Sequence, residues 1–199
     1  MNAFFRHWGL VNAHRFHVWS NGVKCGIGWH CLFHDLSKYT PKEFLPSVKY
    51  FKGTYSPVYE QRLHEDYFSA ICQAHTRRNK HHWEYWTDFF LGRVLAKPMP
   101  WKYATEYVCD MLSASYCYDK EGFSGEKVLR YFESRCPRYY MANGTREYVL
   151  WCLTRFRDLG FAGLRKKDTQ EAYDRIMAEH PGVTIYESLT LAGTLPPLA

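Results

Sequence analysis

His34 and Asp35 are adjacent in the chain, within the stretch Phe33 to Lys38. An imidazole beside a carboxylate offers a neutral nitrogen and an anionic oxygen, a combination that suits a divalent cation. Further histidines and aspartates are spaced along the first 110 residues: His14, His75, His81, His82 and Asp110. These side chains can share a cation only if the segments that carry them pack around a common interior. The fold must therefore bring together segments that are far apart in the sequence.

The composition is that of a globular protein. The chain of 199 residues has the length of one domain with a short tail, and hydrophobic residues make up 46% of it and aromatic residues 18%. This apolar content excludes a disordered chain. No apolar run reaches the length of about 18 residues that a membrane span needs, and Arg6 and His7 interrupt the N-terminal stretch. We expect a cytoplasmic protein with neither a signal peptide nor a membrane partner.

Charge and cysteine usage narrow the choice of partners. The formal net charge is +6, and basic residues cluster only at Arg77-Arg78 and at Arg165 to Lys167. This charge suits an anionic small-molecule substrate. Because no motif for reading nucleic acid is visible, we do not expect a nucleic-acid partner. The seven cysteines stand singly, without a Cys-x-x-Cys pair, which predicts reduced thiols in the core. The sequence leaves the oligomeric state open.

The hydrophobic pattern predicts helices along the whole chain and no sheet. We expect a metal-binding helical core over residues 1–120, further helices of the same domain over 121–180, and an extended arm or tail over 181–199. Thr40 to Glu43 has the form of a capping box, with proline in the first helical position. The predicted helices cover residues 3–23, 27–38, 41–51, 57–77, 81–91, 100–116, 126–134, 146–158 and 168–180.

Helical spacing places several candidate ligands on inward faces. His14 lies on the apolar face of the first predicted helix, and Glu106 lies one turn before Asp110. His64 and His75 share one face of the predicted helix 57–77. A single inward histidine is ordinarily a hydrogen-bonded core residue. Seven candidate ligands together favour a shared metal site inside a helical bundle.

The order of these residues resembles that of the HD superfamily in its binuclear form. That superfamily includes the HD-GYP domains, myo-inositol oxygenase and a phosphonate-cleaving relative of this oxygenase. The Gly-Tyr-Pro motif of the cyclic-dinucleotide enzymes is absent from the sequence. Over about residues 5–118 the chain is similar, more closely, to a family of small bacterial and phage proteins of unknown function. The stretches that carry this similarity are His14 to Val18, His34 to Lys38, Arg78 to Trp86, and Met99 to Asp110.

The resemblance implies an all-α, HD-like bundle with a metal site in its interior. In an HD domain a single metal ion would be held by His14, His34, Asp35 and Asp110. A second ion would need His75, His81 and His82, with Asp35 bridging the two ions. Imidazole and carboxylate ligands accept divalent Fe, Mn, Zn, Co or Ni, so the ligands do not select one metal.

A pair of divalent metals suits the hydrolysis of a small phosphate ester by a metal-activated water, with nucleotides among the candidate substrates. The candidate catalytic residues are Asp35, Lys38 and Glu106, and the candidate substrate-binding residues are Lys38, Arg77, Arg78 and His17. Lys38 lies one turn after Asp35 and is placed to contact phosphate, whereas Glu106 is placed to orient a ligand histidine.

Structural alternatives remain open for most of these residues. Solvated surface positions are the alternative for Lys38 and for Arg77-Arg78. A salt bridge to a neighbouring helix is the alternative for Glu106. By register alone His17 could replace His14 as a ligand, although the resemblance favours His14.

Two other functions fit the same residues. A pair of irons in this ligand set would suit an oxygenase. A non-catalytic binding protein would keep the metal for stability, fold only when metal is present and turn over no substrate. The aromatic residues Trp83, Tyr85 and Trp86 are expected in the core, with a base-stacking platform as the alternative.

Overall fold

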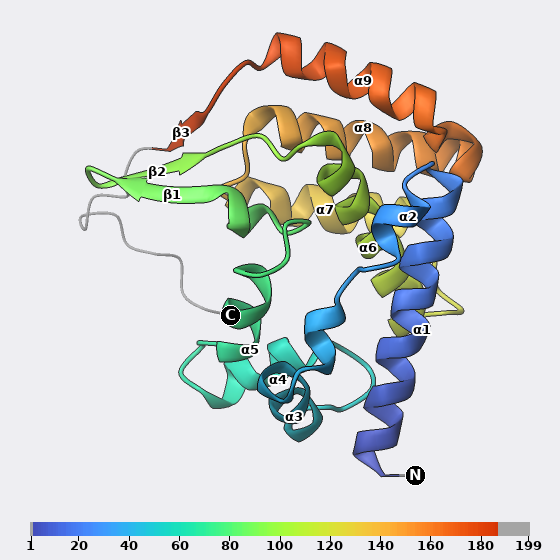
Figure 1. Ribbon diagram of the computed structural model, residues 1–199, viewed down its shortest axis with the longest axis vertical. Helices are drawn as coiled ribbons and strands as arrows, with labels where there is room; N and C mark the ends of the chain where they lie inside the picture. Colours follow the sequence, from blue (N-terminus) through green and yellow to red (C-terminus); the bar gives the residue numbers. More distant parts are fainter. Residues whose placement is uncertain (1, 187–199) are drawn as a thin grey trace.

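Helices form most of the protein in the computed structural model, which describes residues 2–186 (Figure 1). The predominantly α-helical fold predicted from the sequence is confirmed. The α-helices are α1 (Ala3–Lys24), α2 (Gly28–Cys31), α3 (Pro41–Lys49), α4 (Pro57–His64), α5 (Ala70–Thr76), α6 (Trp101–Tyr118), α7 (Gly125–Arg135), α8 (Asn143–Leu159) and α9 (Lys166–Glu179). Short 3-10 helices cover Leu36–Tyr39, Trp83–Trp86, Cys136–Arg138 and Gly160–Leu164. A small sheet contains β1 (Thr87–Phe90), β2 (Arg93–Ala96) and β3 (Thr184–Tyr186).

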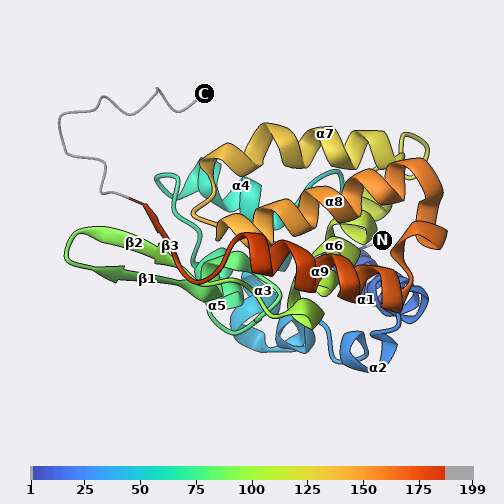
Figure 2. The same cartoon turned by 90° about the horizontal axis from the view of Figure 1, so that it is seen from above.

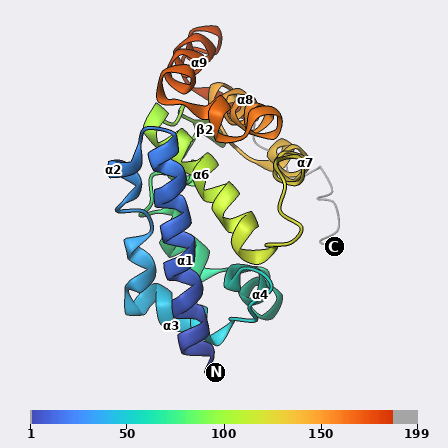
Figure 3. The same ribbon diagram turned by 90° about the vertical axis from the view of Figure 1, so that its right-hand side faces the viewer.

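The long helices α1 and α6 pack against each other, and the remaining helices surround this pair (Figure 3). Helices α7, α8 and α9 form a layer over α6 (Figure 2), whereas α3, α4 and α5 gather near the N-terminal half of α1 (Figure 1). The hydrophobic core contains Val18 of α1, Leu112 of α6, Phe132 of α7, Tyr148 of α8 and Ile176 of α9. The helices after residue 120 therefore share a core with α1 and α6.

Helix α1 begins at Asn2, whose side chain accepts a hydrogen bond from the Phe4 amide. Its buried face carries His7, Val11, His14 and Val18, which recur every three or four residues as an amphipathic helix requires. His14 thus points inward, as its helical spacing predicted. No helix in residues 2–186 has the length and apolar character needed to cross a membrane.

The predicted single helix 57–77 is wrong, because a non-helical segment separates α4 from α5. Asp66 and Tyr67 adopt left-handed conformations, with φ of 44° and 63°, which a continuous helix does not allow. The break also turns His64 away from the interior. Its side chain is 60% exposed and contacts the Glu60 carboxylate, so His64 does not share a face with His75.

The predicted helix 81–91 and the predicted absence of a sheet are also wrong. After a short 3-10 helix, β1 and β2 form an antiparallel hairpin in which Phe90 pairs with Arg93, and β3 pairs with β2. The turn residues Leu91 and Gly92 both have positive φ, as a two-residue hairpin turn requires. Part of the predicted C-terminal arm is therefore a strand, and residues 187–199 lie outside the described residues. Trp83 and Trp86 pack against the hydrophobic core, as predicted, whereas the prediction is wrong for Tyr85, which is 39% exposed.

The predicted helix 27–38 is interrupted between α2 and the 3-10 helix Leu36–Tyr39. Asp35 lies at this interruption in a left-handed conformation, with φ of 53°. Helix α3 begins at Pro41 with Thr40 as its N-cap residue, as predicted, but the reciprocal capping box does not form, because the Thr40 hydroxyl donates to the Ser37 carbonyl and makes no capping hydrogen bond. Glu43 is consequently free to point into the protein, where only 1% of its surface is exposed.

Candidate metal centre

The structure brings all seven candidate ligands together in one buried region. His14 comes from α1 and Asp110 from α6, while His34 and Asp35 come from the loop that follows α2. His75 lies in the last turn of α5, and His81 and His82 follow it in the connection to the sheet. Three groups of side chains there each bring one nitrogen or oxygen atom per residue within 4.8 Å of one another. Two of them contain the seven candidate ligands: His14, His34 and Asp110 in one, and Asp35, His75, His81 and His82 in the other. The third contains His34, His81 and Glu106.

The first group contains ring nitrogens and carboxylate oxygens that face a common point. The His14 Nε2 atom lies 3.0 Å from Asp110 Oδ1 and 3.3 Å from His34 Nε2. Asp35 Oδ2 lies 3.2 Å from His34 Nε2 and 3.9 Å from His14 Nε2. Two imidazoles that turn the same nitrogen toward each other and toward two carboxylates form a suitable set of ligands for a divalent cation.

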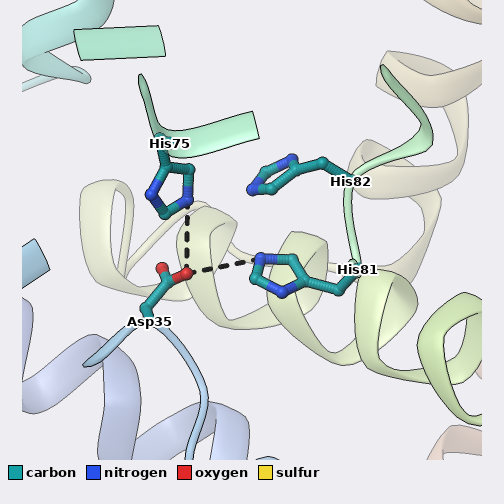
Figure 4. A group of neighbouring side chains, drawn as sticks. All are labelled: Asp35, His75, His81 and His82. Atoms are coloured by element: carbon teal, nitrogen blue, oxygen red, sulfur yellow. Dashed lines mark ion pairs between the residues drawn. The ribbon is translucent and has the colours of Figure 1, made fainter. Parts of the chain in front are cut away.

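The second group surrounds the other oxygen of Asp35 (Figure 4). Asp35 Oδ1 lies 3.2 Å from His75 Nε2 and 3.4 Å from His81 Nε2, and the His82 ring completes the group. One carboxylate therefore turns Oδ2 toward the first group and Oδ1 toward the second. This is the placement that a bridging ligand between two cations needs.

Several of these atoms have no hydrogen-bond partner among the described residues. Asp35 Oδ1, His81 Nε2 and His82 Nε2 are buried and make no hydrogen bond, although Asp35 Oδ1 faces the His75 and His81 rings. A buried polar atom without a partner costs about 1–3 kcal/mol, and a charged one costs more. A cation bound between these atoms would satisfy all of them. The residues present therefore fit a metal ion.

Two buried carboxylates contact the Nδ1 atoms of two ligand histidines, on the side of each ring opposite its Nε2 atom. Glu106 Oε1 lies 2.9 Å from His34 Nδ1, and Glu43 Oε2 lies 2.9 Å from His75 Nδ1. Each carboxylate can accept the Nδ1 proton of its histidine, which leaves Nε2 to face the interior as a ligand. The other oxygen of Glu106 contacts His30 Nε2 at 2.8 Å. The structure thus places Glu106 where it can orient a ligand histidine.

Sequence reasoning missed the roles of Glu43 and His30. Glu43 was assigned to a helix cap because it stands third after Thr40, and nothing in the local pattern points to a distant histidine. For His30 a signal existed, since it precedes His34 by four residues. On the predicted helix 27–38 this spacing places His30 and His34 on one face, although the structure ends α2 at Cys31.

The electrostatics of the metal-free cluster favour anionic carboxylates. Burial would raise the pKa of Asp35, but the neighbouring His34, Lys38 and His75 hold it well below its ordinary value. Burial lowers the pKa of His81 to about 3 and that of His82 well below its ordinary value. These two imidazoles are therefore neutral at physiological pH, as metal ligands must be.

The pKa of His34 is raised rather than lowered, which predicts that metal binding releases a proton. Burial would lower its pKa, but the carboxylates of Asp35, Glu106 and Asp110 raise it to about 10. Below this pH the metal-free imidazole carries a proton that a metal ion must displace. We expect binding of Zn²⁺ near neutral pH to release at least about one proton per protein, and metal affinity to rise with pH up to about 10. Calorimetric titration in two buffers with different ionisation enthalpies measures this release, and equal heats in both would contradict the assignment.

A second prediction concerns the two orienting carboxylates. The variants Glu43→Gln and Glu106→Gln keep the side-chain shape but remove the negative charge behind His75 and His34. We expect each to weaken metal binding by about 10- to 100-fold, measured by competition with a chromophoric chelator. Glu60→Gln is the matched control, because Glu60 is also buried and contacts a histidine, His64, outside the two groups. Equal effects of all three substitutions would show that the loss is not specific to the cluster.

The other residues predicted for the site do not all lie at the cluster: Lys38 and Arg78 contact it, whereas Arg77 and His17 do not. Lys38 Nζ lies 2.6 Å from Asp35 Oδ2 and lines a cavity of about 300 Å³, which we call the lysine cavity. Its walls include the candidate ligands His14, His75, His82 and Asp110. Arg78 reaches Glu43, with 3.5 Å between Nη1 and Oε1. The structure does not bring Arg77 or His17 to the cluster, since Arg77 is exposed and the His17 ring packs on Tyr116.

Comparison with known proteins identifies a family but no function. No curated protein and no solved structure matches the sequence. A family described as a family of unknown function, DUF5662, matches residues 4–153. The matched segment contains all seven candidate ligands as well as Glu43 and Glu106. Because the match covers most of the chain, this protein belongs to the DUF5662 family.

Proposed function

We propose that this protein is an HD-type, metal-dependent phosphohydrolase that acts on a small phosphate ester. The main support is the Asp35 carboxylate, whose two oxygens face two separate groups of imidazole and carboxylate ligands. Two divalent cations held about 3.5 to 4 Å apart lower the pKa of a water and neutralise phosphoryl oxygens during in-line attack. His14, His34 and Asp110 would hold one cation, and His75, His81 and His82 the other, with Asp35 shared.

The lysine cavity is the proposed substrate site. Its lining includes candidate ligands and also apolar residues such as Leu10, Val11 and Ile71. Its volume of about 300 Å³ is at the lower end of the range for small-molecule sites, which favours a small ester. These apolar residues would exclude water from the substrate and would contact its uncharged part.

Lys38 is the residue proposed to bind the phosphate. Its side chain is 34% exposed, and its ammonium is held by the buried Asp35 carboxylate. Burial disfavours the ammonium ion, but Asp35 and Asp110 raise the pKa of Lys38 above its ordinary value, so the group is a permanent cation. A fixed cation beside the ligand groups can stabilise the charge that develops on the phosphoryl oxygens.

The Lys38→Met variant tests this role. We expect the variant to keep its metal content and to lose about 100-fold in kcat/KM on phosphomonoesters, because one charge-stabilising group is removed. The measurement combines elemental analysis with a panel that starts from p-nitrophenyl phosphate. Lys42→Met is the matched control, since Lys42 is exposed and lines neither the lysine cavity nor the ligand groups.

The outcomes separate the role of Lys38 from the proposed activity. Unchanged kinetics in Lys38→Met would contradict only the phosphate contact. Absence of turnover by the metal-loaded wild-type protein on every phosphate ester of the panel would contradict the hydrolase itself. Loss of metal in Lys38→Met would mean that the lysine supports the cluster rather than the substrate.

A further inference from the structure

A second cavity, with a volume of about 540 Å³, shares no lining residue with the lysine cavity. It is bounded by the turn and helix α2 at residues 26–35, the segment 78–81, the first turns of α6, and the start of α9. We call it the basic cavity. Its volume falls within the range of small-molecule binding sites.

Four cationic side chains line the basic cavity: Arg78, Lys80, Lys102 and Lys166. None of the three lysines forms a salt bridge within residues 2–186. The two carboxylates in its wall are already engaged, since Glu106 contacts His30 and His34, and Asp35 contacts Lys38. The charge available to an occupant of the cavity is therefore positive.

One of these lysines, Lys102, stands where helix geometry makes it unfavourable unless an anion is near. It lies in the first turn of α6, which contains no acidic residue, whereas Lys166 is the first residue of α9 and shares the first turn with Asp168. A helix N-terminus carries a partial positive charge, so a lysine there is repelled, whereas an anion is attracted by both the helix end and the lysine. The close packing of Lys166 on the turn at Gly26 leaves no room for a side chain at that glycine, where a Cβ atom would lie 2.6 Å from Lys166 Cβ.

Aromatic side chains stand beside these cations. Trp29 is 80% exposed and Phe33 is 58% exposed, although both line the basic cavity, and the half-buried Tyr103 lines it as well. Large apolar rings at the edge of a cationic cavity provide surfaces on which a planar ring can stack. Positive charge and stacking surfaces together select a ligand that carries both phosphate and an aromatic base.

We propose that the basic cavity binds a free nucleotide, with its phosphates at Lys102 and Lys166 and its base against Trp29 or Phe33. This cavity shares no lining residue with the lysine cavity, although it borders the metal centre through His34, Asp35 and His81, and nucleotide binding there requires no turnover. The cavity, its lysines without salt bridges and its exposed aromatic rings support nucleotide binding whether or not the metal centre is a phosphohydrolase.

Isothermal titration of the metal-loaded protein with the non-hydrolysable nucleotide α,β-methylene-ADP tests the proposal. We expect one binding site, weakened by about tenfold or more in the double variant Lys102→Ala/Lys166→Ala, because charge-assisted contacts to phosphate are lost. Both lysines are exposed, so that the variant should fold, and a thermal melt verifies this. Lys167→Ala is the matched control, since Lys167 is the neighbour of Lys166 but does not line the cavity.

Two further titrations separate the possible occupants. Trp29→Ala should weaken nucleotide binding and leave pyrophosphate binding unaffected. Nucleotide binding retained at wild-type strength in the double variant would place the nucleotide outside the basic cavity and overturn the proposal. Absence of binding, an equal loss in Lys167→Ala, or pyrophosphate bound as tightly as the nucleotide would overturn it as well.

Discussion

In the Asp35→Asn variant, we expect both metal ions to be lost together and phosphate-ester turnover to fall to background. Asparagine keeps the shape of the side chain and tolerates the left-handed backbone at this position, where φ is 53°. What it removes is the negative charge whose two oxygens face the two ligand groups. Because both cations depend on this carboxylate, the loss of metal affinity should exceed the roughly 10- to 100-fold expected for an orienting carboxylate.

Elemental analysis and an activity assay on the purified variant measure these effects. Asp66→Asn is the matched control, since Asp66 also adopts a left-handed conformation, with φ of 44°, but is exposed and lies outside the ligand groups. Circular dichroism shows whether the variant still folds. Full metal content in folded Asp35→Asn would contradict the assignment of Asp35 as the shared ligand.

Removal of the metals should lower the thermal stability by about 10 °C. A ligand present at about 1,000 times its Kd stabilises the folded state by about 4 kcal/mol, and each kcal/mol shifts Tm by about 2–4 °C for a protein of this size. The physical reason is the cluster itself, because a bound cation would give the buried Asp35 Oδ1, His81 Nε2 and His82 Nε2 atoms a partner that no hydrogen bond supplies.

Differential scanning calorimetry before and after chelation, and again after metal is restored, measures this shift. The Asp35→Asn variant serves as the control, because a protein that binds no metal should not respond to the chelator. An unchanged Tm in wild-type protein from which the metal has demonstrably been removed would show that the cluster is stable without a cation.

The parts of the site on long helices could be predicted from the sequence. His14 and Asp110 lie on α1 and α6, where the spacing of apolar residues identifies the buried face. The ligand order could be predicted as well, because the adjacent His34 and Asp35 provide a reference point. The spatial convergence of the seven residues was then expected from bundle packing.

The parts that depend on irregular backbone could not be predicted. Asp35 presents its two oxygens to two groups because its backbone is left-handed, which leaves no periodic signal in the sequence. Glu43 contacts His75 across 32 residues, a contact that no local pattern specifies. The hairpin at Leu91-Gly92 was mistaken for a helix, because its aromatic residues fit either period over so short a segment.

The metal content of the purified wild-type protein tests most directly whether one shared aspartate holds two metal ions. Elemental analysis, with an absorption spectrum before and after dithionite in the absence of air, gives the number and the kind of ions. We expect about two equivalents of a divalent transition metal per chain. A redox-silent pair would support the phosphohydrolase, whereas an iron pair with a redox-sensitive spectrum would favour the oxygenase. No bound metal, even after reconstitution with Mn, Fe, Co, Ni and Zn, would contradict the metal centre and the function proposed from it.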